Sequence, residues 1–158
     1  MHKSHHYLSH LIWTGNTGEG TAGYTNYERS FDIKIAGKTP LLGSSDPAFR
    51  GDASRHNPEE LLLSALSSCH MLWYLHLCAS AGITVVTYED QAEAWMVENT
   101  DGSGRFEKVL LKPLVQIKEE DRLQEALKLH QEANMKCFIA NSVNFEVLHE
   151  GKIKIAGL

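Results

Sequence analysis

The pattern of hydrophobic and polar residues changes along the chain, and each pattern predicts a different element. Residues 31–35 alternate apolar and polar side chains, as a half-buried strand does, and residues 7–13 alternate in part and are expected to form an earlier strand. Residues 61–81 contain no glycine or proline and almost no charge, which is typical of a helix buried on nearly all sides. Residues 119–136 have apolar side chains at helical spacing and predict a second, more amphipathic helix that ends near Cys137.

Two further segments between these helices are rich in β-branched and aromatic residues. Residues 83–97 and 106–117 flank a glycine-containing and polar loop, which predicts a long β-hairpin. Residues 143–148, together with residues 153–155, are expected to supply a closing strand or strand pair. The strands therefore come in blocks instead of alternating with helices, and this order favours the α+β class.

The first helix has the clearest start signal in the chain. Asn57 is a good N-cap residue, Pro58 suits the first helical position, and Glu60 stands where the acid of a capping box belongs. Gly82 is expected to end the helix. We therefore predict a helix that begins at Pro58.

Length and charge exclude several classes of protein. A chain of 158 residues, 42% of them hydrophobic, is expected to form a single domain over residues 1–158. Its net charge of −5 comes from acidic and basic side chains spread along the sequence, so a nucleic-acid partner is not expected. No apolar run approaches the roughly 20 residues of a membrane span, and the start lacks the apolar core of a secretory signal. We therefore expect a cytoplasmic protein without a membrane partner.

The three cysteines are candidates for chemistry. They are too few for a secreted disulfide scaffold, so they are expected to be buried, metal-binding or catalytic. Cys69 and Cys78 are nine positions apart on one predicted helix, which places them on opposite faces and about 13 Å apart along the axis. A disulfide needs Cα atoms within roughly 7 Å. A working pair must therefore join Cys137 to one of the other two, and Cys78, in an apolar stretch, is expected to be a packing residue.

The sequence also leaves two hypotheses other than a thiol enzyme. A metal-binding protein could use the soft and borderline ligands Cys69, His70, His76, Cys78, His130 and Cys137. No Cys-x-x-Cys or His-x-x-x-His pair occurs within this group, and Cys69 and Cys78 face apart on one helix, so no metal is expected. A non-enzymatic domain that binds a hydrophobic ligand could use apolar and aromatic side chains such as Trp73 and Tyr74.

One combination of residues resembles a known family. The run Asn-Pro-Glu-Glu-Leu-Leu at residues 57–62 precedes a helix of small residues that carries Cys69, and a second helix ends in Cys137 after Ala133. This combination resembles the OsmC/Ohr family of thiol peroxidases, which are linked to osmotic induction and organic hydroperoxide resistance. The order of elements fits along nearly the whole chain. The resemblance implies an antiparallel sheet packed on a long buried central helix and a second helix, in an intertwined homodimer.

The resemblance also implies an activity. Cys69 would attack an organic hydroperoxide, or hydrogen peroxide, and become a sulfenic acid, which Cys137 would resolve to a redox-active disulfide. Only a thiolate attacks, and the sulfenic acid must meet a second thiol before it oxidises further. A thiol or dithiol electron donor would then reset the disulfide by exchange. The expected protein is an antioxidant enzyme of the oxidative stress response that needs no cofactor.

The family places an arginine, held by a glutamate, beside the attacking thiol. Glu59 matches the glutamate, and the resemblance points to Arg29 or to Arg50 as the arginine. Ten helical residues separate Glu59 from Cys69 by about 15 Å along one axis. The two can therefore share a site only if the helix breaks or a second subunit brings them together.

The sequence also departs from the best-known branches of the family. Those branches have proline after the second cysteine, whereas Phe138 follows Cys137 here, and His70 stands directly after Cys69. The chain therefore resembles a side branch.

Overall fold

The computed structural model describes residues 3–157. It divides into two compact units, residues 1–61 and residues 62–158, which are described one at a time below. The expected single domain stays a prediction.

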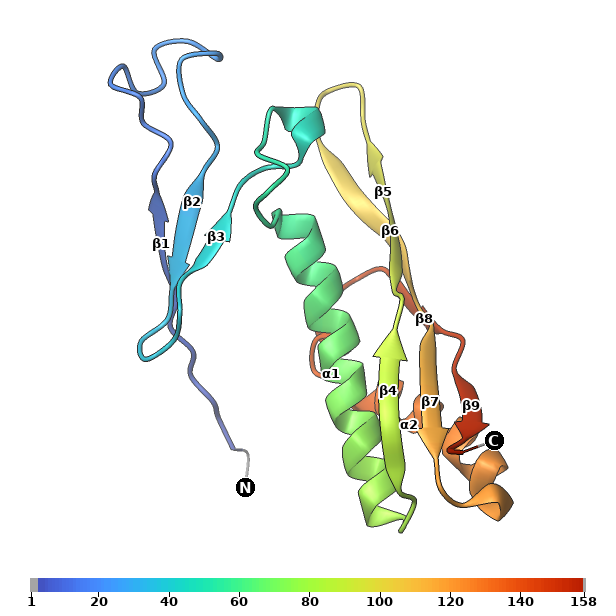
Figure 1. Ribbon diagram of the computed structural model, residues 1–158. Coiled ribbons are helices and arrows are strands. Elements are labelled where there is room, and N and C mark those ends of the chain that lie inside the picture. The colour runs from blue at the N-terminus through green and yellow to red at the C-terminus, as the bar shows by residue number, and fades with distance from the viewer. Residues whose placement is uncertain (1–2, 158) are drawn as a thin grey trace. The chain divides into compact units, whose positions relative to one another are not determined.

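The first unit is built on a small antiparallel sheet. Its strands are β1 (His10–Trp13), β2 (Phe31–Lys34) and β3 (Leu41–Gly43), in the spatial order β1-β2-β3 (Figure 1). The first two strands confirm the predictions from alternation, whereas the three-residue β3 is too short to produce such a pattern. A short 3₁₀ helix, η1 (Pro47–Phe49), follows in the turn-rich segment before the first long helix.

The long helix α1 (Pro58–Ser80) begins and ends as its sequence predicts. The Asn57 side-chain oxygen accepts a hydrogen bond from the Glu60 backbone N–H at 2.8 Å, and the Glu60 carboxylate accepts one from the Asn57 N–H at 3.2 Å. This reciprocal pair is the predicted capping box. Gly82 follows the helix with a φ of +72°, a left-handed conformation that glycine adopts at little cost.

The prediction that α1 is buried on nearly all sides is wrong for the isolated chain. Only a stripe of four residues, spaced by four positions, is buried: Leu66, His70, Tyr74 and Cys78. Leu72, on another face, is 63% exposed. A single layer of sheet together with one neighbouring helix covers one face of a helix, and the remaining apolar faces of α1 stay open.

By length and composition alone, α1 is apolar enough to cross a membrane. The expectation that no apolar run approaches the length of a membrane span is therefore wrong. The core helix of a soluble protein passes the same test, because both contain about 20 consecutive apolar residues.

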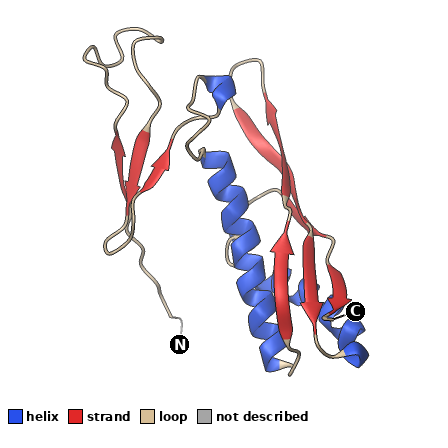
Figure 2. Cartoon of the chain, in the orientation of Figure 1, coloured by secondary structure: helices blue, strands red, loops and turns tan. Residues whose placement is uncertain are grey.

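The second unit contains the predicted long hairpin, divided by an interruption into two ladders. Its strands are β4 (Val85–Asp90), β5 (Glu93–Glu98), β6 (Gly104–Leu111) and β7 (Pro113–Ile117). β5 pairs with β6 and β4 pairs with β7, both antiparallel. At the interruption the Asp90 carboxylate accepts a hydrogen bond from the Lys112 backbone N–H at 2.7 Å. Figure 2 shows the hairpin as two consecutive strand pairs.

The chain then returns through a second helix to complete both ladders. A 3₁₀ turn, η2 (Glu120–Arg122), leads into α2 (Leu123–Lys136), and another, η3 (Ala140–Ser142), precedes β8 (Glu146–His149) and β9 (Lys152–Ile155). The expected antiparallel pairing holds for the hairpin, whereas β8 pairs in parallel with β6 and β9 in parallel with β7. Parallel pairs need a crossover connection, and α2 provides it. The α+β class is confirmed.

Both helices pack on one face of the sheet that β4, β7 and β9 form. Tyr74 and Cys78 of α1 and Ala126 and Ala133 of α2 share one core cluster with alternate strand residues such as Val115. A second cluster joins Leu66 of α1 to β6. In Figure 1, α1 runs alongside β4. This packing brings the carboxyl end of α2 to the middle of α1, where Cys69 lies.

Candidate active site

Cys69 lies in the middle of α1, in an apolar hollow. The thiol is half-buried. The hollow has a volume of about 390 Å³ and is lined by Ala65, Ser68, Cys69, Leu72, Trp73, Phe138 and Ile139. Trp73 and Phe138 meet edge to face at 5.7 Å between ring centroids. The wall of this hollow thus combines α1 with the segment that follows α2.

Cys137 caps the carboxyl end of α2, beside Cys69, and is buried. Burial, and after it the neighbouring Cys69 thiol, raise the pKa of the Cys137 thiol to about 11. The Ala140 N–H donates a hydrogen bond to the Cys137 sulfur at 3.4 Å. Cys137 is therefore a protonated thiol at neutral pH, and it is poorly suited to be the thiolate that attacks first.

Cys78 belongs to the core and not to this hollow. Its side chain is fully buried in the cluster with Tyr74, and burial raises the pKa of its thiol. The structure thus brings Cys69 and Cys137 together and keeps Cys78 apart, as the helical geometry predicts.

The two candidate arginines lie in the first unit, and both stack on Tyr24. The Arg29 guanidinium lies 4.5 Å from the Tyr24 ring centroid and 4.2 Å from that of Tyr27. It also donates hydrogen bonds to the backbone oxygens of Tyr24 at 2.8 Å and Tyr27 at 2.6 Å. The Arg50 guanidinium lies 5.9 Å from the Tyr24 centroid, and Arg50 has a left-handed φ of +64°. The family resemblance points to Arg29 or to Arg50 as alternatives, and in the fold both guanidinium groups lie over the ring of Tyr24.

Glu59 lies in the first turn of α1 and is half-buried. Among the described residues of its own unit, no cation forms an ion pair with it. Because α1 is continuous from Pro58 to Ser80, the possibility that the helix breaks between Glu59 and Cys69 is excluded.

A group of buried histidines lies next to the thiols, and the sequence did not reveal it as a group. His70 and His130 are fully buried, and their Nε2 and Nδ1 atoms lie 3.1 Å apart. The His130 ring stacks on Tyr74 at 3.9 Å between centroids, and His149 of β8 lies 5.6 Å from His70. The available signal was the position of His70 on the four-residue stripe of α1, but this does not identify a partner on another helix.

These imidazoles do not form a metal site. Among the described residues, no group of three or more His, Cys, Asp or Glu side chains is arranged to hold a metal ion. His76, another ligand candidate, is exposed. The geometry therefore gives no support to the metal-binding reading.

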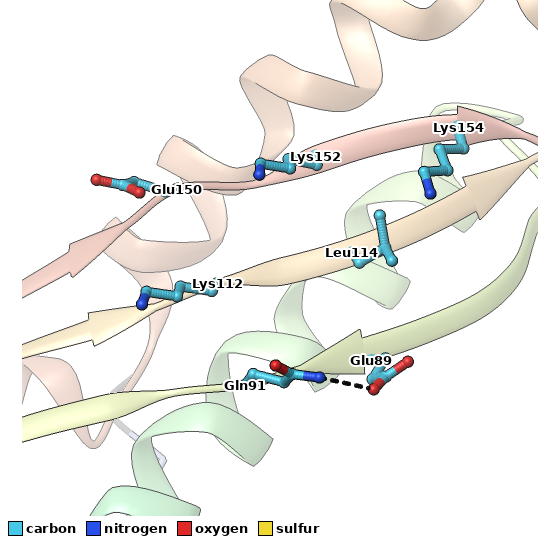
Figure 3. A pocket seen from close by; sticks show the side chains of 7 residues that line it. All are labelled: Glu89, Gln91, Lys112, Leu114, Glu150, Lys152 and Lys154. Atoms are coloured by element: carbon cyan, nitrogen blue, oxygen red, sulfur yellow. Dashed lines mark hydrogen bonds between the residues drawn. The ribbon is translucent and has the colours of Figure 1, made fainter.

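A larger hollow of about 560 Å³ lies on the other face of the sheet (Figure 3). Its side chains carry both charges and include no thiol: Glu89, Gln91, Lys112, Leu114, Glu150, Lys152 and Lys154. Gln91 donates a hydrogen bond to Glu89 at 3.3 Å, and Lys112 pairs with Glu93 at 2.6 Å. Within the described part of the chain, no Cys, Ser or Thr side chain lines this hollow. The smaller hollow, which is lined by Cys69 and has Cys137 beside it, is the better candidate for chemistry.

Comparison with known proteins agrees with this fold. The family model for OsmC-like proteins matches residues 51–150, a segment that contains both thiols. The chain belongs to the OsmC-like protein family. The OsmC-like protein of unknown function from Vibrio cholerae is 30% identical, with a TM-score of 0.83 over 94% of this chain and 100% of that one.

Two other proteins are similar to this chain at lower identity. The uncharacterized protein YmaD of Bacillus subtilis is 25% identical over 97% of each chain. An organic hydroperoxide resistance protein from Elizabethkingia anophelis is 15% identical, with a TM-score of 0.68 over 98% of this chain and 99% of that one. At this identity the second likeness shows the fold alone.

Proposed function

We propose that this OsmC-like protein is a thiol-dependent peroxidase that reduces organic hydroperoxides. Cys69 is the attacking residue and Cys137 resolves its sulfenic acid. The observation that carries the proposal is the position of a half-buried thiol in an apolar hollow with a second, protonated thiol as its neighbour. The name of the Elizabethkingia anophelis relative, an organic hydroperoxide resistance protein, supports the same reaction class.

The chemistry balances with the two thiols and one external donor. The Cys69 thiolate attacks the terminal peroxide oxygen, the O–O bond breaks, and the terminal OH stays on sulfur as the sulfenic acid while the leaving alkoxide takes a proton from water. The Cys137 sulfur then attacks the Cys69 sulfenic acid, so that an S–S bond forms, the S–O bond breaks and water leaves. A dithiol restores both thiols by exchange and becomes oxidised itself.

Apolar side chains around Cys69 favour an organic substrate. Leu72, Trp73, Phe138 and Ile139 contribute most of the wall, and Phe138 is 68% exposed. Contact with an alkyl or aryl group of the peroxide removes this apolar surface from water, which gains free energy in proportion to the buried area. Hydrogen peroxide offers no such group.

The remaining parts of the proposed site come from the family. One of Arg29 and Arg50, held by Glu59, stabilises the Cys69 thiolate in an intertwined homodimer. The open faces of α1 support the dimer, because only 22% of the residues in its most apolar stretch are buried within this chain. A second subunit that covers α1 makes this helix the core of a cytoplasmic dimer and not a membrane span.

The test is consumption of cumene hydroperoxide with dithiothreitol as donor. Cys69→Ser is expected to abolish turnover, because no other thiol lies in the hollow. Cys78→Ser, a matched change on the same helix, is expected to keep turnover within a few fold. If Cys69→Ser keeps full activity, the assignment is wrong.

A second test addresses the arginine and the dimer. Either Arg29→Ala or Arg50→Ala, but not both, is expected to lower the rate at least tenfold and to raise the pKa of the Cys69 thiol. Sedimentation at micromolar concentration is expected to give a dimer. A monomer, or two arginine variants with the wild-type rate, contradicts this part of the proposal.

A domain that binds a hydrophobic ligand without turnover is the second candidate, because the same apolar hollow suits it. Binding of cumyl alcohol without peroxide consumption by the wild-type protein would favour this candidate.

A further inference from the structure

The buried imidazole pair of His70 and His130 joins the two helices that carry the thiols. Its nitrogen atoms lie 3.1 Å apart, and the two rings are nearly parallel, with 6° between their planes. A second contact lies one turn further along α1, where the Tyr74 hydroxyl donates a hydrogen bond to the Ala126 backbone oxygen at 3.1 Å. Within residues 3–157 these are the only side-chain hydrogen bonds between α1 and α2.

The pair is placed to control the distance between the two thiols. His70 is the residue after Cys69 on α1. His130 precedes Cys137 by seven positions, which is about two helical turns, so the two side chains lie on one face of α2. Ala126, His130, Ala133 and Cys137 form the buried stripe of this face. Fixing His130 against His70 therefore fixes the end of α2 at which Cys137 lies.

The pair has a feature that packing alone does not explain. Among the described residues, His70 Nδ1 and His130 Nε2 are buried and have no hydrogen-bond partner. Unpaired buried nitrogens destabilise a fold, and apolar side chains at both positions would avoid that cost. Two imidazoles in this place are better explained by the geometry that their shared hydrogen bond imposes.

The backbone around His130 also restricts the ring. Tyr74 stacks on His130 with 10° between the two planes. Gly151, next to β9, approaches so closely that a Cβ atom there would lie 2.3 Å from His130 Cδ2. The imidazole is thus held between a phenol ring and a glycine backbone, and its Nδ1 is directed at His70.

We propose that the His70–His130 pair positions the resolving thiol. The hydrogen bond keeps α2 in register on α1, so that Cys137 meets the oxidised Cys69. The pair acts on closure of the disulfide and not on attack on the peroxide, since neither imidazole lines the hollow. This role rests on the proposed peroxidase function, and His70 and His130 are positioning residues without contact to substrate.

The test measures the two steps separately. Rapid-quench samples are treated with a 1,3-dicarbonyl that traps the Cys69 sulfenic acid, and mass spectrometry counts the trapped and the disulfide forms. In His130→Leu, closure is expected to slow at least tenfold while sulfenic acid forms within twofold of the wild-type rate. A small displacement of a reacting group can cost about 100-fold in rate. A second molecule of hydroperoxide is then expected to oxidise the accumulated sulfenic acid to sulfinic acid, with release of a second alcohol.

Two amide variants separate the hydrogen bond from packing. The amide of asparagine lies where the Nδ1 atom of histidine lies, so His130→Asn can keep the bond to His70 and is expected to close within about threefold of wild type. The longer His130→Gln carries its amide past this position and is expected to close as slowly as His130→Leu. Gln131→Ala, an exposed change on the same helix, is the control. If His130→Leu does not fold, comparison of His130→Asn with His130→Gln still tests whether the hydrogen bond sets the rate of disulfide closure.

A peroxide-free measurement separates failure of this proposal from failure of the peroxidase assignment. In a glutathione redox buffer, the effective concentration of Cys137 toward Cys69 is expected to fall at least tenfold in His130→Gln and to stay within threefold in His130→Asn. Equal values for the two variants would refute the positioning role, whether or not the protein consumes peroxide.

Discussion

Mild acid is expected to destabilise this fold, at pH values still above those at which carboxylates titrate. The reason is that the core holds neutral histidines. Burial lowers the pKa of His70 to about 4, and burial together with His70 lowers that of His130 to about 3. The titratable groups that face the pair are Tyr74 of α1, whose pKa is raised by burial, and His149 of β8, whose pKa is lowered by burial. No carboxylate among the causes of these shifts offsets a positive charge on the pair.

The sign and the size of the effect follow from proton linkage. An unfolded chain has a histidine pKa of about 6.5, so below this pH the unfolded state binds protons that the folded state does not. Stability is therefore complete above pH 6.5, falls with decreasing pH, and levels off only below the folded pKa values. At pH 5, about 1.5 units below 6.5, each of the two histidines costs about 2 kcal/mol. The sum of about 4 kcal/mol is a large part of a typical stability of roughly 5 to 15 kcal/mol.

Urea unfolding between pH 7.5 and pH 5, followed by tryptophan fluorescence at one protein concentration, measures the effect. His130→Gln removes one of the buried imidazoles, so the pH dependence is expected to decrease by about one proton, or about 1.4 kcal/mol per pH unit. His76→Gln removes an exposed imidazole of the same helix and is the matched control. If His130→Gln keeps the wild-type slope of unfolding free energy against pH, or if His76→Gln lowers that slope as much, the buried pair is not the source of the acid sensitivity.

Three further predictions concern the stability of the fold and use the same unfolding assay at pH 7.5. Asn57→Ala removes the helix cap and is expected to cost about 1 kcal/mol, whereas Asn57→Asp should keep most of it; equal losses would contradict the capping role. Gly151→Ala places a Cβ atom 2.3 Å from His130 Cδ2 and is expected to cost about 1 to 3 kcal/mol, and an unchanged stability would show that the backbone yields there. Leu111→Ala empties a fully buried site of β6 and is expected to cost about 2 to 5 kcal/mol, far more than the same change at the exposed Leu127.

The elements that local chemistry determines could be predicted from the sequence. The capping box at Asn57 and the glycine at Gly82 bound α1 within two residues, because these signals act on the backbone next to them. The hairpin was predictable from two strand-like segments around a polar loop. That Cys69 and Cys137 lie close together was expected from helix geometry together with the family resemblance, and the two thiols are neighbours in the fold.

Features that depend on distant contacts could not be predicted. The division of the hairpin at Asp90 and Lys112, and the parallel pairing of β8 and β9, arise from where the chain returns after α2. The burial of α1 was overestimated, because an apolar sequence does not reveal whether its own chain or a partner covers it. The histidine pair is the clearest case, since 60 positions separate its members and neither has a distinctive motif.

The polar pair in this core also explains how a small helix can hold one register. Leu66, His70, Tyr74 and Cys78 are spaced by four residues on α1, and the facing stripe of α2 contains the small residues Ala126 and Ala133. Small residues alone would tolerate a slide of α2 by one turn, about 5.4 Å along the axis. Such a slide would separate the two imidazoles and leave two further buried nitrogens unpaired, at roughly 1 to 3 kcal/mol each. The same slide would carry Cys137 away from Cys69 by the same distance, so the bond that disfavours the wrong register also keeps the two thiols within reach.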